Sequence, residues 1–177
     1  MKNVVFIVGG ARSGKSSYAV DLARKSKQTV VFIATCTYKD EEMDERIKKH
    51  RRHRPSSWKV ITEGKGIAGL LKKMYSPSRT LVVDCLGLWV FNLLEDKLTD
   101  AQIEGEFKKL AAALGKAKGT VILVSNEVGC GLVPSYLIGR RFRDLLGRGN
   151  QIIAQSADEV FMMQIGFPTL LKSRGKK

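Results

Sequence analysis

One stretch near the amino terminus limits the possible folds more than any other. It matches the P-loop pattern G-x-x-x-x-G-K-[ST] with the residues Gly9-Gly10-Ala11-Arg12-Ser13-Gly14-Lys15-Ser16. The apolar run Val4–Val8 before it predicts a strand, and residues 17–23 after it predict a helix. Because the P-loop pattern acts in this strand–loop–helix context, the sequence predicts a nucleotide site.

The residue types of this stretch suit a phosphate chain. Glycines let the backbone curl so that successive N–H groups point inward, and the following helix adds the positive end of its dipole. Lys15 is expected to neutralise β- and γ-phosphate oxygens, and the Ser16 hydroxyl to bind Mg²⁺. The alternative is a glycine-rich turn without a ligand, which four fixed positions in the right context argue against.

The rest of the chain alternates between strand and helix patterns. This alternation predicts an α/β fold with a mostly parallel sheet flanked by helices, in one domain over residues 1–177. The expected strands cover residues 4–8, 29–34, 59–62, 80–84, 120–125 and 160–165. The expected helices cover residues 17–25, 40–54, 67–74 and 86–94, one that opens with the capping box Thr99-x-x-Gln102, and 134–156 with an interruption near Gly147 and Gly149.

Parallel sheets bind ligands outside the carboxyl ends of their strands, so the residues at those ends are candidates. Ala34, Thr35 and Cys36 end the second strand and are expected to meet the nucleotide. Asp84 ends a buried strand in the Walker B manner, and it is expected to complete the Mg²⁺ shell with Ser16. For a general base, Glu127 and Asp84 remain open alternatives.

The amino-acid composition narrows the possible binding partners only slightly. A net charge of +14 could serve nucleic acid or an anionic nucleotide, and the excess lies in residues 48–54 and in the tail 172–177, which we take as a solvated end. Aromatic residues make up only 7% of the chain, with no visible stacking platform, so a nucleic-acid-binding ATPase ranks last. There is no apolar run of membrane-spanning length and no apparent signal peptide, and the three cysteines are widely spaced, so we predict a cytoplasmic protein.

A second group of candidates follows an acidic helix start. It consists of consecutive basic residues, His50, Arg51, Arg52, His53 and Arg54. Dense arginines suit the oxygens of a triphosphate, and histidine is a known covalent nucleophile. Neighbouring cations favour a neutral imidazole, whereas a helix carboxyl end favours the charged form. From these residues alone, a catalytic His50 and a solvated charge run both remain open.

Taken together, these motifs give a resemblance over nearly the whole chain. The chain resembles the bifunctional adenosylcobinamide kinase / adenosylcobinamide-phosphate guanylyltransferase family of cobalamin synthesis. The resemblance rests on Gly9–Ser16, Ile33-Ala34-Thr35, Asp40-x-Glu42-Met43-x-x-Arg46-Ile47-x-x-His50, Arg54-Pro55, Trp58, Asn92-Leu93-Leu94, Ser125–Pro134, Phe142-Arg143-Asp144, Gly147-Arg148-x-Asn150-Gln151 and Ala157–Val160.

The resemblance implies two reactions. ATP or GTP phosphorylates the hydroxyl of adenosylcobinamide, and GTP then gives GMP to that phosphate through a guanylylated histidine, which maps onto His50. Nucleotide contacts map onto Gly9–Ser16, Ala34–Cys36, Arg51–Arg54 and the acids Glu63 and Asp84. The family often places its acid four residues after the tryptophan equivalent to Trp58, where this chain has Thr62, with Glu63 following. A RecA-like sheet and a homotrimer are also implied. A small-molecule kinase without guanylyl transfer is the second interpretation.

Overall fold

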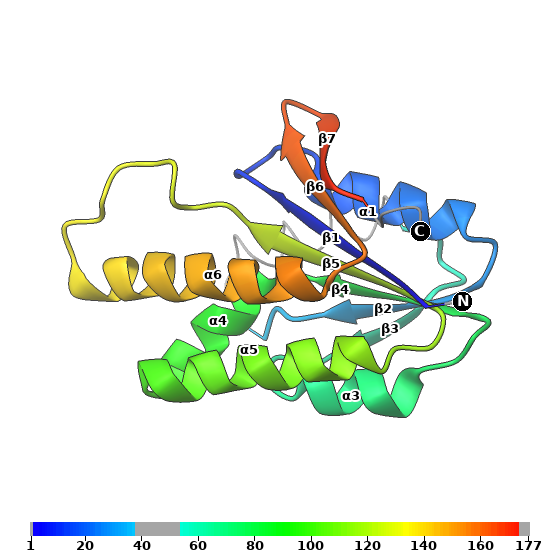
Figure 1. Cartoon of the computed structure of the whole chain (residues 1–177), viewed down its shortest axis with the longest axis horizontal. Coiled ribbons are helices and arrows are strands. Elements are labelled where there is room, and N and C mark those ends of the chain that lie inside the picture. The colour runs from blue at the N-terminus through cyan, green and yellow to red at the C-terminus, as the bar shows by residue number, and fades with distance from the viewer. Residues whose placement is uncertain (1, 38–53, 174–177) are drawn as a thin grey trace.

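The computed structural model describes residues 2–37 and 54–173. The strands are β1 (Asn3–Gly9), β2 (Thr29–Ala34), β3 (Lys59–Thr62), β4 (Arg79–Asp84), β5 (Thr120–Asn126), β6 (Glu159–Gln164) and β7 (Phe167–Lys172). The helices are α1 (Lys15–Lys25), α3 (Ile67–Met74), α4 (Leu86–Glu95), α5 (Asp100–Gly115) and α6 (Leu137–Ser156) (Figure 1). The helix expected over residues 40–54 lies almost wholly outside the described residues.

The strands form one sheet in the order β3-β2-β4-β5-β1-β6-β7. Every pair from β3 to β6 is parallel, and only β7 runs antiparallel to its neighbour. The predicted α/β fold with a mostly parallel sheet is therefore confirmed. Because the parallel strands share one direction, their carboxyl ends meet along one edge, and the loop after β1 lies at that edge.

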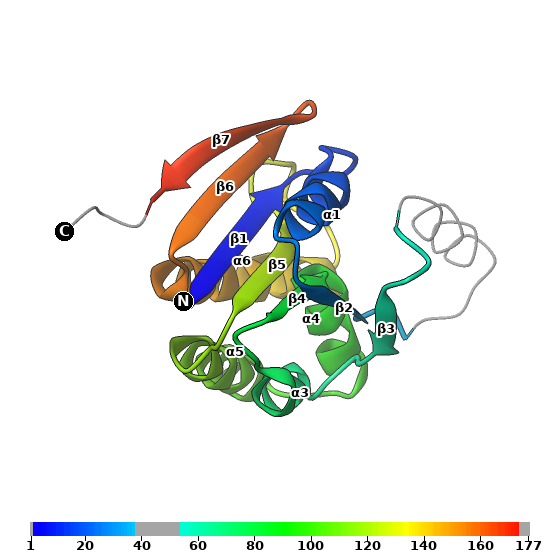
Figure 2. The same cartoon turned by 90° about the vertical axis from the view of Figure 1, so that its right-hand side faces the viewer.

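Helices cover both faces of the sheet, as Figure 2 shows. One hydrophobic core joins the sheet to α3, α4, α5 and α6, with Trp89 and Phe107 in edge-to-face contact at 4.9 Å between ring centroids. A smaller core joins the opposite face to α1 through Ala19, Val20 and Ala23. Since both faces of β1, β4 and β5 are covered, these strands are continuous apolar runs, which made them readable from the sequence.

Helix α6 corrects one expectation. The helix is continuous from Leu137 to Ser156, without the interruption expected near Gly147 and Gly149. A Cβ atom at Gly149 would lie 2.1 Å from Cζ of Phe107 on α5. The glycine therefore permits close packing of two helices and does not end one. Residues 134–136, expected in this helix, precede it.

The carboxyl-terminal region departs from expectation in a second way. The last parallel strand, expected over 160–165, is β6 (Glu159–Gln164), and the chain then turns back as β7, which the sequence analysis did not predict. Lys172, expected to begin a solvated tail, ends β7, and its Nζ donates to the carbonyls of Ala154 and Gln155 at 2.9 Å. Among the described residues, no helix is long and apolar enough to cross a bilayer.

Candidate nucleotide-binding site

The register of the sheet places most of the predicted site residues side by side. Gly9 at the end of β1 pairs with Asn126 of β5. Asp84 at the end of β4 pairs with Ala34 of β2, and Ala34 also pairs with Thr62 of β3. Candidates from distant parts of the sequence thus share one edge of the sheet, as the pattern of strands predicted.

The P-loop joins β1 to α1 at this edge. Gly14, which precedes α1, has a φ of 93°, a left-handed conformation that glycine adopts without strain. Lys15 is buried, and its Nζ donates to the Gly10 carbonyl at 2.5 Å and lies 3.5 Å from the Ser13 hydroxyl. The lysine is therefore folded back across its own loop, in the position that a phosphate chain would share.

Burial lowers the pKa of Lys15 and outweighs the opposite influence of Cys85 and Asp84. The negative charge of Asp84 therefore interacts with the ammonium of Lys15. Ser16, the second residue of α1, supplies a hydroxyl beside that lysine. A hydroxyl and a carboxylate oxygen are ligands that Mg²⁺ accepts together with nucleotide phosphates, so Ser16 and Asp84 fit the predicted metal site.

The Thr35 hydroxyl, expected to meet the nucleotide, forms its hydrogen bonds with the protein backbone. The residue is fully buried, and its Oγ1 accepts from the Cys85 amide and donates to the Cys85 carbonyl, each at 2.7 Å. The hydroxyl therefore fastens the end of β2 to the residue that follows Asp84. In this arrangement Thr35 positions the predicted metal ligand, and its side chain has no remaining proton to donate to a nucleotide.

Asn92 of α4 also supports the end of β2 through hydrogen bonds. Its Nδ2 donates to the carbonyls of Thr35 at 2.8 Å and Gly64 at 3.1 Å, and its Oδ1 accepts from the Thr37 hydroxyl at 3.0 Å. The amide thereby ties the ends of β2 and β3 to one helix. The sequence analysis named Asn92 only as part of the family motif and predicted no structural role for it. A polar asparagine inside the apolar run of residues 86–94 could have indicated such a role.

Glu63 follows β3 and its amide donates to the Ala34 carbonyl at 2.9 Å. Its Oε1 accepts from the backbone amides of Lys65 and Gly66, at 2.9 and 2.8 Å, just before α3. The structure thus brings Glu63 to the predicted edge. One carboxylate oxygen is used to order the turn into α3.

Glu127 follows β5, and its amide donates to the Gly9 carbonyl at 2.9 Å. Its Oε1 accepts from the Gly129 amide at 2.6 Å, and its Oε2 from the Cys130 amide at 3.1 Å. Burial opposes ionisation, but these backbone hydrogen bonds prevail and lower the pKa of Glu127. A carboxylate stabilised in this way is a weaker proton acceptor than one without such hydrogen bonds.

A second amide, on the half-buried Asn150, supports the end of β5. The Oδ1 of Asn150, on α6, accepts from the Ser125 hydroxyl at 2.6 Å, and its Nδ2 donates to the Asn126 carbonyl at 3.0 Å. The side chain of Asn126 in turn accepts from the Cys85 thiol at 3.4 Å. Burial raises the pKa of Cys85 to about 12, so this thiol is a hydrogen-bond donor at neutral pH. Sequence reasoning assigned Asn150 no role.

The second group of candidates, residues 50–54, falls mostly outside the described residues. His50, Arg51, Arg52 and His53 all lie there, and Arg54 begins the next described segment. The Arg54 guanidinium lies over the Phe32 ring of β2, with Cζ 4.1 Å from the ring centroid. The chain therefore returns to the sheet beside the strand that carries Ala34 and Thr35.

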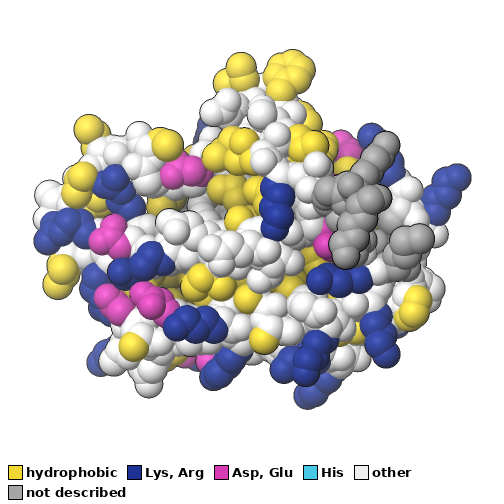
Figure 3. All heavy atoms as spheres, viewed as in Figure 1, with side chains coloured by type: hydrophobic (Ala, Val, Ile, Leu, Met, Phe, Trp, Pro, Cys, Tyr) yellow, Lys and Arg dark blue, Asp and Glu magenta, His cyan; other side chains and the backbone are white. Residues whose placement is uncertain are grey.

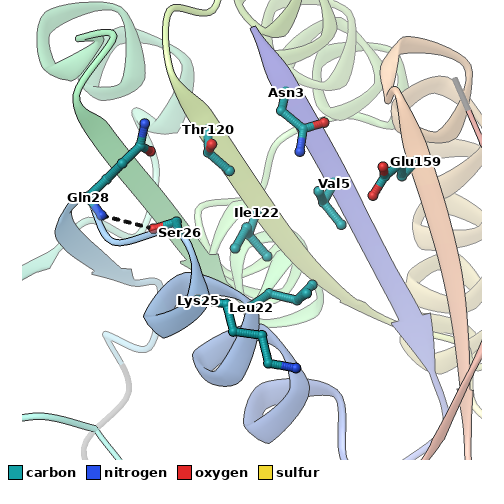
Figure 4. A pocket seen from close by; sticks show the side chains of 9 residues that line it. All are labelled: Asn3, Val5, Leu22, Lys25, Ser26, Gln28, Thr120, Ile122 and Glu159. Atoms are coloured by element: carbon teal, nitrogen blue, oxygen red, sulfur yellow. Dashed lines mark hydrogen bonds between the residues drawn. The ribbon is translucent and has the colours of Figure 1, made fainter. Parts of the chain in front are cut away.

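A cavity of about 290 Å³ lies at the other end of the sheet (Figure 4). Its lining includes Asn3, Thr120 and Glu159, the first residues of β1, β5 and β6, together with Lys25 at the end of α1. The P-loop follows the last residue of β1, so this cavity is separate from the candidate site. It marks the part of the sheet face that α1 does not cover.

These features together define a P-loop nucleotide-binding protein. Two solved structures share the fold. One is described as an ATPase domain, with a TM-score of 0.55 and 15% identity, and the match covers 99% of this chain and 78% of that one. The other is the flagellar accessory protein FlaH of Methanocaldococcus jannaschii, with a TM-score of 0.53 and 13% identity, covering 99% and 81%.

Sequence comparison identifies the family. Residues 5–171 match the CobU family, described as "Cobinamide kinase / cobinamide phosphate guanyltransferase", and the chain belongs to this family of bifunctional enzymes. It is 42% identical over 168 residues to the bifunctional adenosylcobalamin biosynthesis protein CobP of Pseudomonas aeruginosa, covering 94% of this chain and 95% of that protein. It is 35% identical over 181 residues to CobU of Escherichia coli, covering 96% and 99%. The predicted resemblance is confirmed.

Proposed function

We propose that this protein phosphorylates adenosylcobinamide with ATP or GTP and then transfers GMP from GTP to the product, giving adenosylcobinamide-GDP and pyrophosphate. The observation that carries the proposal is the joint placement of Lys15, Ser16 and Asp84 at one edge of the sheet, in a chain of this family. That arrangement suits charge neutralisation at a transferring phosphoryl group.

In the kinase step, the acceptor hydroxyl attacks the γ-phosphorus and the bond to the β–γ bridging oxygen breaks, so a nucleoside diphosphate leaves. The P-loop amides and Lys15 are proposed to hold the β- and γ-phosphates. Of the two candidate bases we assign the proton to Asp84, because backbone amides already stabilise the Glu127 carboxylate. Ser16 and Asp84, together with phosphate oxygens of the nucleotide, would hold Mg²⁺, which would supply positive charge at the transferring group.

In the guanylyl step, an imidazole nitrogen of His50 attacks the α-phosphorus of GTP and pyrophosphate leaves. An oxygen of adenosylcobinamide phosphate then attacks that phosphorus, the phosphorus–nitrogen bond breaks and His50 is regenerated. Arg51, Arg52, His53 and Arg54 are proposed to stabilise the departing pyrophosphate. Covalent catalysis of this kind divides one displacement into two easier steps.

The experiment uses GTP labelled at the α-phosphate. The wild type should retain acid-labile, alkali-stable label after denaturation, His50→Asn should retain none, and the neighbouring control His53→Asn should keep it. Because the P-loop is unchanged, His50→Asn should still bind nucleotide and phosphorylate adenosylcobinamide. Undiminished label in His50→Asn would place the nucleophile elsewhere, and an unlabelled wild type would identify a kinase without guanylyl transfer.

We further propose that the protein is a cytoplasmic homo-oligomer, a trimer by resemblance, with one domain over residues 1–177. Support comes from β7, an edge strand whose six residues are all exposed, including Leu170 and Leu171. Exposed apolar edge strands are usually covered by another chain. Sedimentation equilibrium tests this: a monomeric wild type would contradict it, and Leu171→Ser should weaken the assembly.

A further inference from the structure

Two segments flank the P-loop and contact it through backbone hydrogen bonds. The loop after β5 is joined to it where the Glu127 amide donates to the Gly9 carbonyl at 2.9 Å. The turn between β6 and β7 is joined to it where the Gly166 amide donates to the Ser13 carbonyl at 3.1 Å. In Figure 1 the P-loop lies between this loop and the tip of the β6–β7 hairpin.

The loop after β5 displays apolar side chains although polar contacts hold it in place. Arg143 of α6 donates to the Gly129 carbonyl at 2.8 Å, and Arg140 donates to the carbonyls of Pro134 at 3.1 Å and Ser135 at 2.6 Å. Between these anchors, Leu132 is 97% exposed. The loop therefore presents this leucine to solvent from an ordered backbone, which lowers the entropic cost of binding a ligand there.

The hairpin carries an exposed apolar side chain on the side of the sheet that α6 covers. Phe167 pairs with Gln164 of β6, and strand alternation places both residues on the face of Val160 and Met162. Val160 belongs to the core beneath α6, so this is the α6 face. Phe167 is 73% exposed. Figure 3, which views this face, shows hydrophobic side chains on the hairpin, on the loop and between them.

We define the apolar rim as exposed apolar residues of the two segments that flank the P-loop, Leu132, Val133 and Tyr136 from the loop after β5 and Phe167 from the hairpin. Resting on the proposed function, we infer that the apolar rim binds the corrinoid ring system of the acceptor. The acceptor hydroxyl must reach the γ-phosphate in the P-loop, so the bulk of the acceptor must lie beside that loop. A large conjugated macrocycle is held mainly by apolar and aromatic contact.

Position argues for the acceptor over a second copy of the chain. The two segments that carry the apolar rim are joined to the P-loop by the backbone hydrogen bonds from Glu127 to Gly9 and from Gly166 to Ser13. Leu170 lies farther along β7 and pairs with Phe161, which packs in the core on the opposite face of the sheet. Leu170 therefore suits contact between subunits on that face, and this leaves the apolar rim for the substrate.

The test compares Leu132→Ser and Phe167→Ser with the control Val60→Ser, an exposed apolar residue on β3 at the far edge of the sheet. Each rim variant should raise the KM for adenosylcobinamide by about tenfold or more, the scale on which loss of one large apolar contact weakens binding. The KM for GTP, the label from α-labelled GTP and the sedimentation mass should not change. Val60→Ser should match the wild type in every measurement.

An unchanged acceptor KM in both rim variants would overturn the inference. So would a fall in sedimentation mass that accompanies the loss of acceptor affinity, because a second copy would then cover the apolar rim. Equilibrium dialysis with adenosylcobinamide itself, followed by its visible absorbance, separates this inference from the proposed function. Binding that depends on Leu132 and Phe167 in a wild type that takes no label would uphold the acceptor surface while rejecting guanylyl transfer.

Discussion

The P-loop and the ends of β2 and β3 lie at the same edge of the sheet, but their polar side chains are used differently. At the ends of β2 and β3, Thr35, Glu63 and Asn92 direct their polar atoms to neighbouring backbone groups. In the P-loop, Lys15 bonds, among the described residues, within its own loop, where it feels the negative charge of Asp84. The polar side chains at the ends of β2 and β3 therefore stabilise the backbone, whereas Lys15 of the P-loop is placed to bind a ligand.

The largest effect should come from the P-loop. Lys15→Ala removes a charge-assisted contact to phosphate, worth about 1.5–3 kcal/mol, or about 10- to 150-fold in nucleotide affinity. Both transfer reactions should fall with it. The midpoint of urea denaturation should stay close to that of the wild type, because the hydrogen bonds of the ammonium to the described part of the chain lie within the loop. Fluorescence titration with GTP and product assays measure the two effects.

The matched control is Lys25→Ala at the exposed end of the same helix, which should bind GTP like the wild type. Intact nucleotide binding in Lys15→Ala would refute the role assigned to the P-loop. A large loss of stability in Lys15→Ala would remove the contrast between the two regions.

The two regions also differ in how well the sequence predicts them. The P-loop is a local pattern, and the strands β1, β4 and β5 are buried runs, so both were read correctly from the chain. The roles of Thr35 and Asn92 depend on partners 50 and 57 residues away, Cys85 for Thr35 and the Thr35 carbonyl for Asn92, which no local pattern contains. Strand β7 was missed because all of its residues are exposed and it includes Pro168, so no alternation marks it.

Intermediate effects should come from the end of β2. Thr35→Val keeps the shape of the side chain but leaves the amide and carbonyl of Cys85 without the threonine hydroxyl, a loss of about 1–3 kcal/mol in the free energy of unfolding. Affinity for GTP should change by less than it does in Lys15→Ala. Urea denaturation and GTP titration of the same samples test both statements.

Thr35→Ser retains the hydroxyl and should recover most of the lost stability. A Thr35→Val protein that is fully stable but binds GTP weakly would show that the hydroxyl contacts the nucleotide, contrary to the structure.

The smallest effect concerns Glu127, whose carboxylate orders the loop that begins the apolar rim. Its hydrogen bond and its charge raise the pKa of the Cys130 thiol, which holds that thiol in the unreactive protonated form. Glu127→Gln keeps an acceptor oxygen but removes the charge, so the pKa of Cys130 should fall toward its ordinary value. At a pH below that value, the thiolate fraction and the rate of alkylation by iodoacetamide should rise.

Peptide mass spectrometry distinguishes alkylation of Cys130 from that of Cys36 and Cys85, and Glu95→Gln on α4 is the control. Kinase turnover in Glu127→Gln should stay within about tenfold of the wild type, because a carboxylate held by backbone amides is a weak base. A loss on the order of the 10²–10⁴-fold contribution of a general base would assign proton transfer to Glu127 in place of Asp84.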